Sequence, residues 1–321
     1  MKNILNCITI GDEKGIGLEL IYKIWKNHKK NTKTFFLIGN YLNIKRKLKK
    51  YNNFIKLFKI NNPLEAKIYF NKYLPVIDLK SDFNEKITLN ALNIAHKYIK
   101  EKLITAIITL PINKNKIISI NKNFIDQTDY FGKLDKKESS MILYSKKIIV
   151  FPLTTHIPIN KIGKYINKSY VRKKIKKLFV SLNKDFKLNN FKIGISGLNP
   201  HAGENGKIGI EEKKVLIPII KEFKKKGFMI QGPISPDAIF LNKNIKKFDC
   251  IITMYHDQAL IPFKILNHDD GVNYTSGLSF IRTSPCHGTA YDIVGKNIGD
   301  EKSLLNAIKL ANLIYKNRNN A

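Results

Sequence analysis

Apolar positions along the chain follow two alternating patterns. Short runs rich in β-branched residues occur at 4–10, 32–39, 105–111 and 147–156, and stretches with apolar positions every three or four residues lie between such runs. The first pattern is typical of buried strands and the second of amphipathic helices. The alternation continues along the chain, with strands predicted at 191–198 and 249–257 and helices predicted at 168–182, 210–226 and about 300–318. This repeat predicts an α/β fold with a parallel sheet covered by helices.

The length of the chain predicts about two domains. With 321 residues, 43% of them hydrophobic, the chain can bury a large core. No repeat, heptad run or low-complexity linker divides it. The segment 121–140 interrupts the strand and helix pattern and is a candidate crossing point between domains.

The charge is strongly basic, but few of the cations are arginines. Lysine and arginine number 57 against 25 acidic residues, a formal net charge of +32, yet arginine occurs only at 46, 172, 282 and 318. Readout of nucleic acid favours the planar fork of arginine. We therefore expect lysines spread over solvated faces in a genome rich in A and T, with a polyanion-binding surface as the alternative.

The chain termini and the cysteines predict a cytoplasmic protein. The apolar run before Gly11 is too short for a signal peptide, and no later stretch is long enough to span a membrane. Cys7, Cys250 and Cys286 are too far apart for a metal or redox motif, and their odd number argues against a disulfide framework.

The glycine-rich segments do not match the common phosphate-binding motifs. "GDEKGIG" at 11–17 lies between a predicted strand and helix, and "GENGKIG" lies at 203–209. Neither fits the dinucleotide fingerprint or the P-loop. Each is read as a tight turn, and a bound dinucleotide would need a different kind of site.

Three of the seven histidines follow predicted strands. His156 in "TTHIPI", His201 in "LNPHAGE" and His256 in "MYHDQ" would lie at carboxyl ends of strands, where ligands bind in open α/β sheets. Together they would suit a catalytic divalent ion, with Asp237 and Asp257 orienting the rings. The alternative is three separate loop histidines, each with its own hydrogen bonds.

The order of several motifs resembles the 4-hydroxythreonine-4-phosphate dehydrogenase family over nearly the whole chain. The motifs are "GDEKGIGLEL", "TLPINK", "TTHIPI", "GLNPHAGENGKIGIEE", "GPISPDAIF", "MYHDQALIPFK" and "GVNYTSGLSFIRTSPCHGTAYDIVGK". The resemblance implies a two-domain α/β/α fold of the isocitrate and isopropylmalate dehydrogenase type. Its active site would lie in the interdomain cleft at a homodimer interface. The expected domains are 1–125 plus 283–321, and 126–282 with the histidines.

The resemblance also implies roles for individual residues. The metal ligands would be His156, His201 and His256. The other implied contacts are to substrate by Gln127, Thr128, Lys264, Asn273 and Arg282, and to NAD or NADP by His287, Gly288, Thr289, Ala290 and Asp292, with Lys296 shaping that loop. Arg282 would bind an oxyanion through two parallel hydrogen bonds, or else form a structural ion pair. The "CHGTAYDIVGK" loop could instead be an ordinary helix start.

The implied chemistry is the metal-dependent oxidation of an alcohol by NAD or NADP. The substrate would be 4-phosphohydroxy-L-threonine, and the resulting β-keto acid would lose carbon dioxide to give a precursor of pyridoxal phosphate. The ion would be zinc, magnesium or cobalt. Asp237, Asp257 and Lys114 are candidate proton acceptors, and a metal-bound water is a further alternative. No membrane partner is expected, and nucleic acid is an unlikely one.

One departure from the family pattern bears on the substrate. Family members usually have histidine where this chain has Gln127. An amide can bond to an oxyanion but cannot balance its charge. A dehydrogenase of the same fold acting on another phosphorylated hydroxy acid, such as a four-carbon sugar acid phosphate, is therefore a second candidate. A basic, non-enzymatic nucleic-acid-binding protein is the third.

Overall fold

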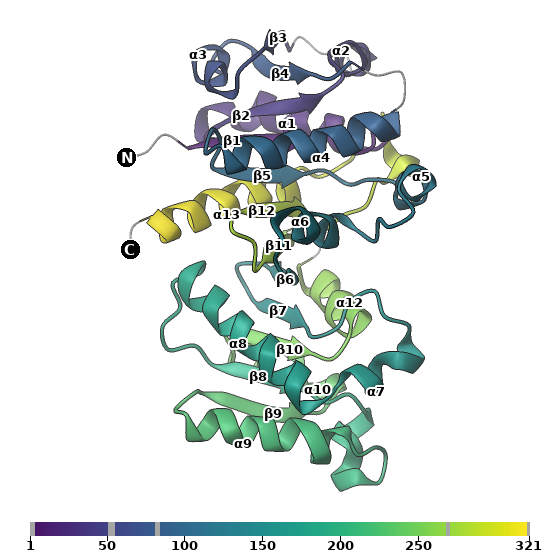
Figure 1. The fold of residues 1–321 in the computed structure, drawn as a ribbon, viewed down its shortest axis with the longest axis vertical. Helices are drawn as coiled ribbons and strands as arrows, with labels where there is room; N and C mark the ends of the chain where they lie inside the picture. The colour runs from purple at the N-terminus through teal and green to yellow at the C-terminus, as the bar shows by residue number, and fades with distance from the viewer. Residues whose placement is uncertain (1–3, 51–54, 81–83, 268–269, 320–321) are drawn as a thin grey trace. The chain divides into compact units, whose positions relative to one another are not determined.

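The chain folds into two compact units, each built around a mostly parallel sheet. The computed structural model describes residues 4–50, 55–80, 84–267 and 270–319. One unit comprises Met1–Ser140 and Val272–Ala321, and the other comprises Met141–Gly271. The predicted α/β class is confirmed (Figure 1).

The first unit carries seven strands in the order β3-β4-β2-β1-β5-β12-β11. All neighbouring pairs are parallel except β11 and β12. Its strands are β1 (Leu5–Thr9), β2 (Thr34–Gly39), β3 (Leu57–Ile60), β4 (Leu74–Asp78), β5 (Ala106–Thr109), β11 (Val272–Ser276) and β12 (Arg282–Pro285). Its helices are α1 (Gly17–His28), α2 (Tyr41–Lys50), α3 (Ala66–Tyr69), α4 (Asn84–Lys100), α5 (Lys114–Ile120), α6 (Gln127–Asp135) and α13 (Lys302–Asn319).

The second unit carries five strands in the order β6-β7-β10-β8-β9. The pair β6 and β7 is antiparallel, and the other pairs are parallel. Its strands are β6 (Ser140–Tyr144), β7 (Ile149–Pro152), β8 (Ile193–Ser196), β9 (Ile230–Ile234) and β10 (Cys250–Thr253). Its helices are α7 (Ile162–Tyr165), α8 (Lys168–Lys184), α9 (Ile217–Lys225), α10 (Pro236–Ile239), α11 (Asn242–Ile245) and α12 (His256–Asn267).

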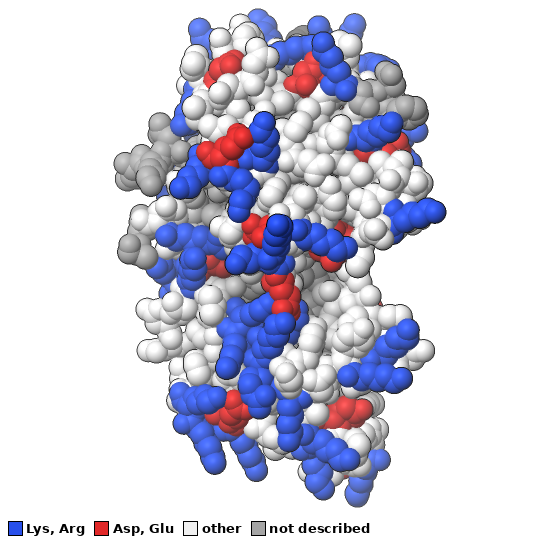
Figure 2. All heavy atoms as spheres, in the orientation of Figure 1, with Lys and Arg blue, Asp and Glu red and all other residues white. Residues whose placement is uncertain are grey.

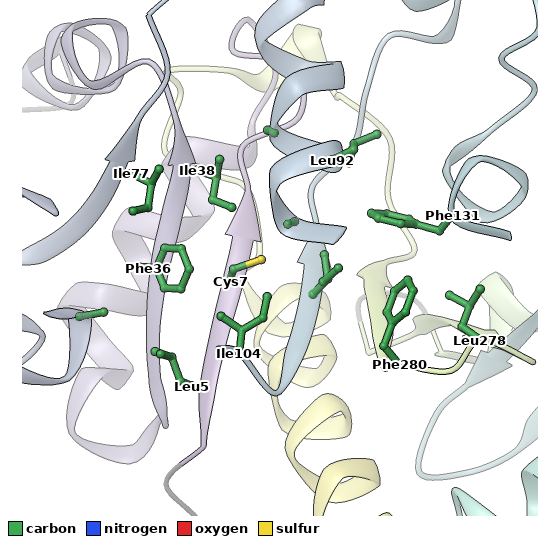
Figure 3. Close-up of a cluster of buried hydrophobic side chains, with 14 of the residues drawn as sticks. Leu5, Cys7, Phe36, Ile38, Ile77, Leu92, Ile104, Phe131, Leu278 and Phe280 are labelled. Carbon is green, nitrogen blue, oxygen red and sulfur yellow. The ribbon is translucent and has the colours of Figure 1, made fainter. Parts of the chain in front are cut away.

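The core of the first unit joins segments from both ends of the chain. α4 packs on β1, β2 and β5, and α13 packs on β5, β11 and β12. A cluster of buried side chains between these elements includes Cys7, Phe36 and Leu92 (Figure 3). Phe131 of α6 and Phe280 pack in the same cluster, with ring centroids 5.7 Å apart. Residues 126–140 and 272–282, which the sequence analysis grouped with the histidines, therefore belong to the first unit.

The cations are distributed over the surface among acidic side chains. Figure 2 shows lysine and arginine on all parts of the visible face, with aspartate and glutamate between them. Some form ion pairs, such as Lys59 with Asp78 (2.6 Å) and Arg172 with Glu222 (2.8 Å). Across the described ranges, no helix has the length and apolar character needed to cross a membrane.

Candidate functional site

Four parallel strands of the second unit have their carboxyl ends at one edge of the sheet, and a candidate residue follows each of them. His156 follows β7, His256 follows β10, His201 follows β8 and Asp237 follows β9. In open α/β sheets ligands bind beyond this edge. We call these four residues the histidine edge.

Hydrogen bonds between the strand ends hold the loops of the histidine edge together. The Thr154 hydroxyl donates to the Met254 carbonyl (2.8 Å), which ties the loop after β7 to the loop after β10. Gln258 then accepts from the Met254 N–H (2.7 Å) and donates to the Gly197 carbonyl after β8 (2.9 Å). One amide side chain therefore fixes the β10 loop against the β8 loop.

Two of the three histidines lie close together. The rings of His156 and His256 have centroids 5.7 Å apart and planes at 40°. Two imidazoles bound to one tetrahedral ion at about 2.1 Å have ring centres about 5 Å apart. The Nδ1 of His256 also lies 3.2 Å from Asp257 Oδ1, a contact of the kind that orients a ligating ring.

His201 lies on the neighbouring loop. The pKa of Asp237 is lowered, first by the hydrogen bond from the Ser235 hydroxyl and then by backbone N–H groups and the charge of His201. Within the residues described here, no three His, Cys, Asp or Glu side chains are already arranged around a metal position. The imidazole nitrogens are donors that a divalent ion accepts, and they lie where ligands bind in such sheets. His156 and His256 have a suitable spacing, whereas His201 does not complete a three-ligand group with them.

The backbone is strained where two of the histidines lie. His156 has φ 36° and His201 has φ 49°, in the left-handed region. Ala202, Glu204 and Asn205 share this conformation. Each such residue costs about 1–2 kcal/mol when it is not glycine. Strain of this kind persists only where the surrounding contacts determine the conformation, and it clusters at functional sites.

Arg282 forms a buried cationic pocket in the first unit. Its guanidinium donates to the hydroxyls of Thr109 (2.5 and 3.1 Å), Thr275 (2.9 Å) and Thr128 (3.3 Å). Only 3% of Arg282 is exposed, and within the described residues its hydrogen bonds all go to threonine hydroxyls. Burial lowers its pKa to about 10, while the charge of Asp126 raises it. A buried cation with neutral partners is suited to bind an anion.

Two further substrate candidates flank this pocket and one lies elsewhere. Gln127 begins α6, donates through Nε2 to the Leu110 carbonyl (3.1 Å), and has its Oε1 buried without a partner among the described residues. Asn273 lies on β11 opposite Ser284 of β12. Lys264 is exposed on α12 in the second unit, on the helix that begins with His256.

The predicted cofactor loop is attached to the first glycine turn. The Ile16 N–H donates to the Thr289 carbonyl (2.9 Å), and Gly15 approaches so closely that a Cβ would lie 3.0 Å from that carbonyl. The Tyr291 hydroxyl donates to Asp12 (2.5 Å). The glycine turn therefore supports the loop that contains "HGTAY". The spacing of its glycines does not indicate this role.

The candidate cofactor residues themselves line an open part of this loop. A Cβ on Gly288 would meet no atom within 4 Å, and Ala290 has φ 46°. The His287 Nδ1 lies 2.9 Å from the Gly288 carbonyl, and Asp292 is exposed. Gly288 is exposed and has open space around it, so this part of the loop is accessible to a ligand.

Sequence comparison relates this chain to one enzyme family. Residues 31–311 match the family described as pyridoxal phosphate biosynthetic protein PdxA. The chain belongs to the PdxA family. It is 38% identical over 318 residues to 4-hydroxythreonine-4-phosphate dehydrogenase of Sulfurihydrogenibium sp., covering 97% of this chain and 98% of that protein. It is also 38% identical over 311 residues to the Aquifex aeolicus enzyme of that name, covering 94% and 96%.

Solved structures of PdxA relatives have the same fold. The 4-hydroxythreonine-4-phosphate dehydrogenase of Klebsiella pneumoniae matches with TM-score 0.82 and 28% identity, over 97% of this chain and 99% of that one. The Burkholderia phymatum structure of that name matches with TM-score 0.77 and 30% identity, over 98% and 99%. A terephthalate 1,2-cis-dihydrodiol dehydrogenase at 21% identity and TM-score 0.59 shares the fold.

The candidate proton acceptors of this PdxA chain differ in their surroundings. Asp237 is exposed, and the hydrogen bond from the Ser235 hydroxyl lowers the pKa of its carboxyl. Asp257 is exposed beside His256 in the second unit. Lys114 is exposed at the start of α5 in the first unit, far along the chain from the histidine edge.

Several residues that shape these sites were not identified from the sequence. They are Thr109 and Thr275 around Arg282, Gln258 between the strand ends, and Asp12 beneath the cofactor loop. Position after a predicted strand would have been a signal for Asp12. The sequence carries no comparable signal for the others, because their partners lie far away along the chain.

Proposed function

We propose that this chain oxidises 4-phosphohydroxy-L-threonine with NAD or NADP and a divalent ion. The hydride leaves for the nicotinamide and the hydroxyl proton goes to a base, giving 2-amino-3-oxo-4-phosphooxybutanoate. Loss of carbon dioxide then gives 3-amino-2-oxopropyl phosphate, a step towards pyridoxal phosphate. The observation that carries the proposal is the match to relatives of this activity along nearly the entire chain.

The histidine edge would hold the divalent ion. His156 and His256 already have a spacing close to that of ligands on one ion, and His201 would complete the set. When bound, zinc, magnesium or cobalt lowers the pKa of a coordinated hydroxyl, while the nicotinamide accepts the hydride. Asp257 orients the His256 ring through its contact with Nδ1. The candidate bases are Asp237, Asp257, Lys114 and a metal-bound water.

Arg282 would bind an anionic group of the substrate. Its three hydroxyl partners hold the guanidinium plane in one orientation and exclude water from its buried side. These bonds use four of the five N–H donors, so one N–H is left for a phosphate or carboxylate, and a second becomes available only when a threonine bond is exchanged. Thr128, Asn273, Gln127 and Lys264 are proposed to contact the rest of the substrate.

The open loop after β12 would bind the dinucleotide. Gly288 is exposed and leaves open space beside the backbone, and His287, Thr289, Ala290 and Asp292 of the same loop are proposed to contact the dinucleotide. The attachment of Tyr291 to Asp12 keeps the loop in place without a ligand.

We also propose a cytoplasmic homodimer. Cys7 and Cys250 are free and buried, and Cys286 is free, as a reducing compartment allows. Large apolar side chains are exposed on the loops of the second unit, including Ile159 (76%), Ile208 (43%) and Ile210 (47%). Light scattering after size-exclusion chromatography tests the dimer.

Oxidation of a different phosphorylated hydroxy acid is the second candidate, and Gln127 is the observation that favours it. The amide replaces the usual histidine and presents no positive charge to a phosphate. A four-carbon sugar acid phosphate is the natural comparison substrate.

Turnover with a chelator tests the proposed reaction. We expect NADH or NADPH formation from 4-phosphohydroxy-L-threonine that EDTA abolishes and that added Zn²⁺, Mg²⁺ or Co²⁺ restores. The sugar acid phosphate, assayed in parallel, separates the two candidates. Absence of activity with both substrates and all three ions would contradict the proposed reaction.

Replacing Gln127 with histidine is expected to stabilise the first unit. The buried Oε1 has no partner among the described residues, which costs about 1–3 kcal/mol, whereas an imidazole can keep a donor on the Leu110 carbonyl. We expect Tm to rise by about 2–4 °C. Gln127→Leu is the control: it removes the unpaired Oε1 but also the donor to the Leu110 carbonyl, so its Tm should rise less than that of Gln127→His. Equal Tm values for both variants would contradict this account.

A further inference from the structure

The turn that begins at His201 has a backbone conformation that is unfavourable for most of its residues. Residues 201–205 all have positive φ, from 40° to 79°, and only Gly203 among them lacks a Cβ. Successive left-handed residues with side chains are unfavourable without support from outside the turn. The support must therefore come from a neighbouring element.

Glu212 supplies hydrogen bonds at the base of this turn. It begins the π-helical turn Glu212–Leu216, which leads into α9. Its Oε1 accepts from the N–H groups of Leu198 (2.7 Å) and Asn199 (2.7 Å), and its Oε2 accepts from Asn199 Nδ2 (2.9 Å). These donors belong to the segment just before His201.

The backbone closes around the Glu212 carboxylate from two sides. A Cβ on Gly203, inside the turn, would lie 2.7 Å from Oε2. A Cβ on Gly197, before the turn, would lie 3.2 Å from Oε1. The carboxylate therefore fills the interior of the loop, and glycine is needed where the chain passes it.

Within the described residues, the Glu212 carboxylate accepts hydrogen bonds from these three N–H groups. Its exposure is 2%, and it forms no ion pair with a lysine or arginine in the described part of the chain. Charged acceptors form the stronger hydrogen bonds, and a carboxylate only accepts. In Glu212→Gln, the side-chain NH₂ would face Asn199 Nδ2, and that hydrogen bond would be lost while the bonds to Oε1 remain. This variant therefore removes only part of the support for the turn.

The geometry points to Glu212 as a positioning residue that holds the left-handed turn and thereby sets the direction of the His201 ring. It acts through the backbone and contacts neither substrate nor cofactor. The inference rests on the proposed function only in that His201 is taken as a ligand of the divalent ion.

Hydrogen exchange in the metal-free, full-length protein tests the structural part. We expect Glu212→Ala to speed amide exchange in a peptide covering 197–205 at least about tenfold, with Glu212→Gln in between. Glu211→Gln is the matched control, because Glu211 also accepts from Asn199 Nδ2 (2.8 Å) but bonds no N–H before the turn. If Glu212→Ala does not fold, Glu212→Gln decides. Wild-type exchange in both Glu212 variants would overturn the inference.

Titration with Co²⁺ alone tests the effect on His201. We expect a loss of affinity of about 10- to 100-fold and a changed visible spectrum in Glu212→Ala, a smaller loss in Glu212→Gln, and wild-type behaviour in Glu211→Gln. A wild-type Co²⁺ spectrum in Glu212→Ala would overturn the positioning role. A wild-type protein that binds no Co²⁺ would instead contradict the proposed metal site, while hydrogen exchange still decides whether Glu212 holds the turn.

Discussion

Replacing Arg282 with methionine is expected to lower kcat/KM for the phosphorylated substrate by at least about 100-fold without destabilising the ligand-free protein. A charge-assisted hydrogen bond from the guanidinium to an anion contributes about 1.5–3 kcal/mol. In the absence of ligand, the hydrogen bonds of the buried cation within the described residues all go to hydroxyls, and burial lowers its pKa to about 10 although the charge of Asp126 raises it. A shift of that size corresponds to about 3 kcal/mol of lost stability at every pH below about 10.

The sign of this effect can be checked with pH. Because the folded state binds this proton more weakly than the unfolded state does, stability rises as pH increases through about 10 and above. Methionine removes that dependence along with the charge. Denaturant unfolding at neutral pH should show a free energy of unfolding for Arg282→Met equal to or above that of the wild type.

Inorganic phosphate and Arg282→Lys provide the controls for this prediction. Phosphate is expected to raise the Tm of the wild type and to leave the Tm of Arg282→Met unchanged. Arg282→Lys keeps a charge but lacks the planar fork, so its activity should stay close to that of the methionine variant. An Arg282→Met protein that is several kcal/mol less stable and still responds to phosphate would show that the arginine is structural.

Removing any one of the three histidines is expected to weaken Co²⁺ binding at least about 100-fold and to abolish most turnover. Loss of residues that merely orient metal ligands costs about 10- to 100-fold in affinity, so loss of a ligand itself should cost at least as much. His156→Ala, His201→Ala and His256→Ala should therefore behave alike, although only two of the rings are close together in the structure.

His287→Ala is the matched control for the metal prediction. It removes a partly exposed histidine of the cofactor loop, in the other unit. We expect a higher KM for the dinucleotide and unchanged Co²⁺ affinity. Normal Co²⁺ binding by His201→Ala would support the alternative that the loop histidines are independent of one another.

The sequence predicted the local elements well, because periodicity depends only on neighbouring residues. The strands expected at 4–10 and 249–257 are β1 and β10, and the helix expected at about 300–318 is α13. The order of the strands was not predictable in the same way. β12 lies beside β5, although more than 170 residues of the chain separate Thr109 from Arg282.

The site residues also differ in whether local sequence could predict them. Position at strand ends was sufficient to single out the three histidines, since the carboxyl ends of parallel strands share an edge. The threonines around Arg282 and the carboxylate of Glu212 were missed, because neutral hydroxyls and one glutamate among 25 acidic residues carry no local pattern. Their roles depend on contacts between distant segments.

The discontinuity of the first unit has a consequence for biosynthesis. Residues 141–271 form an uninterrupted unit that can fold as soon as it leaves the ribosome, whereas β5 has no neighbour on one side until β12 is translated. During that interval a nascent chain carries an unpaired strand edge, a known starting point for aggregation. A chaperone that shields this edge would improve the yield of folded enzyme more than one that acts on the completed chain.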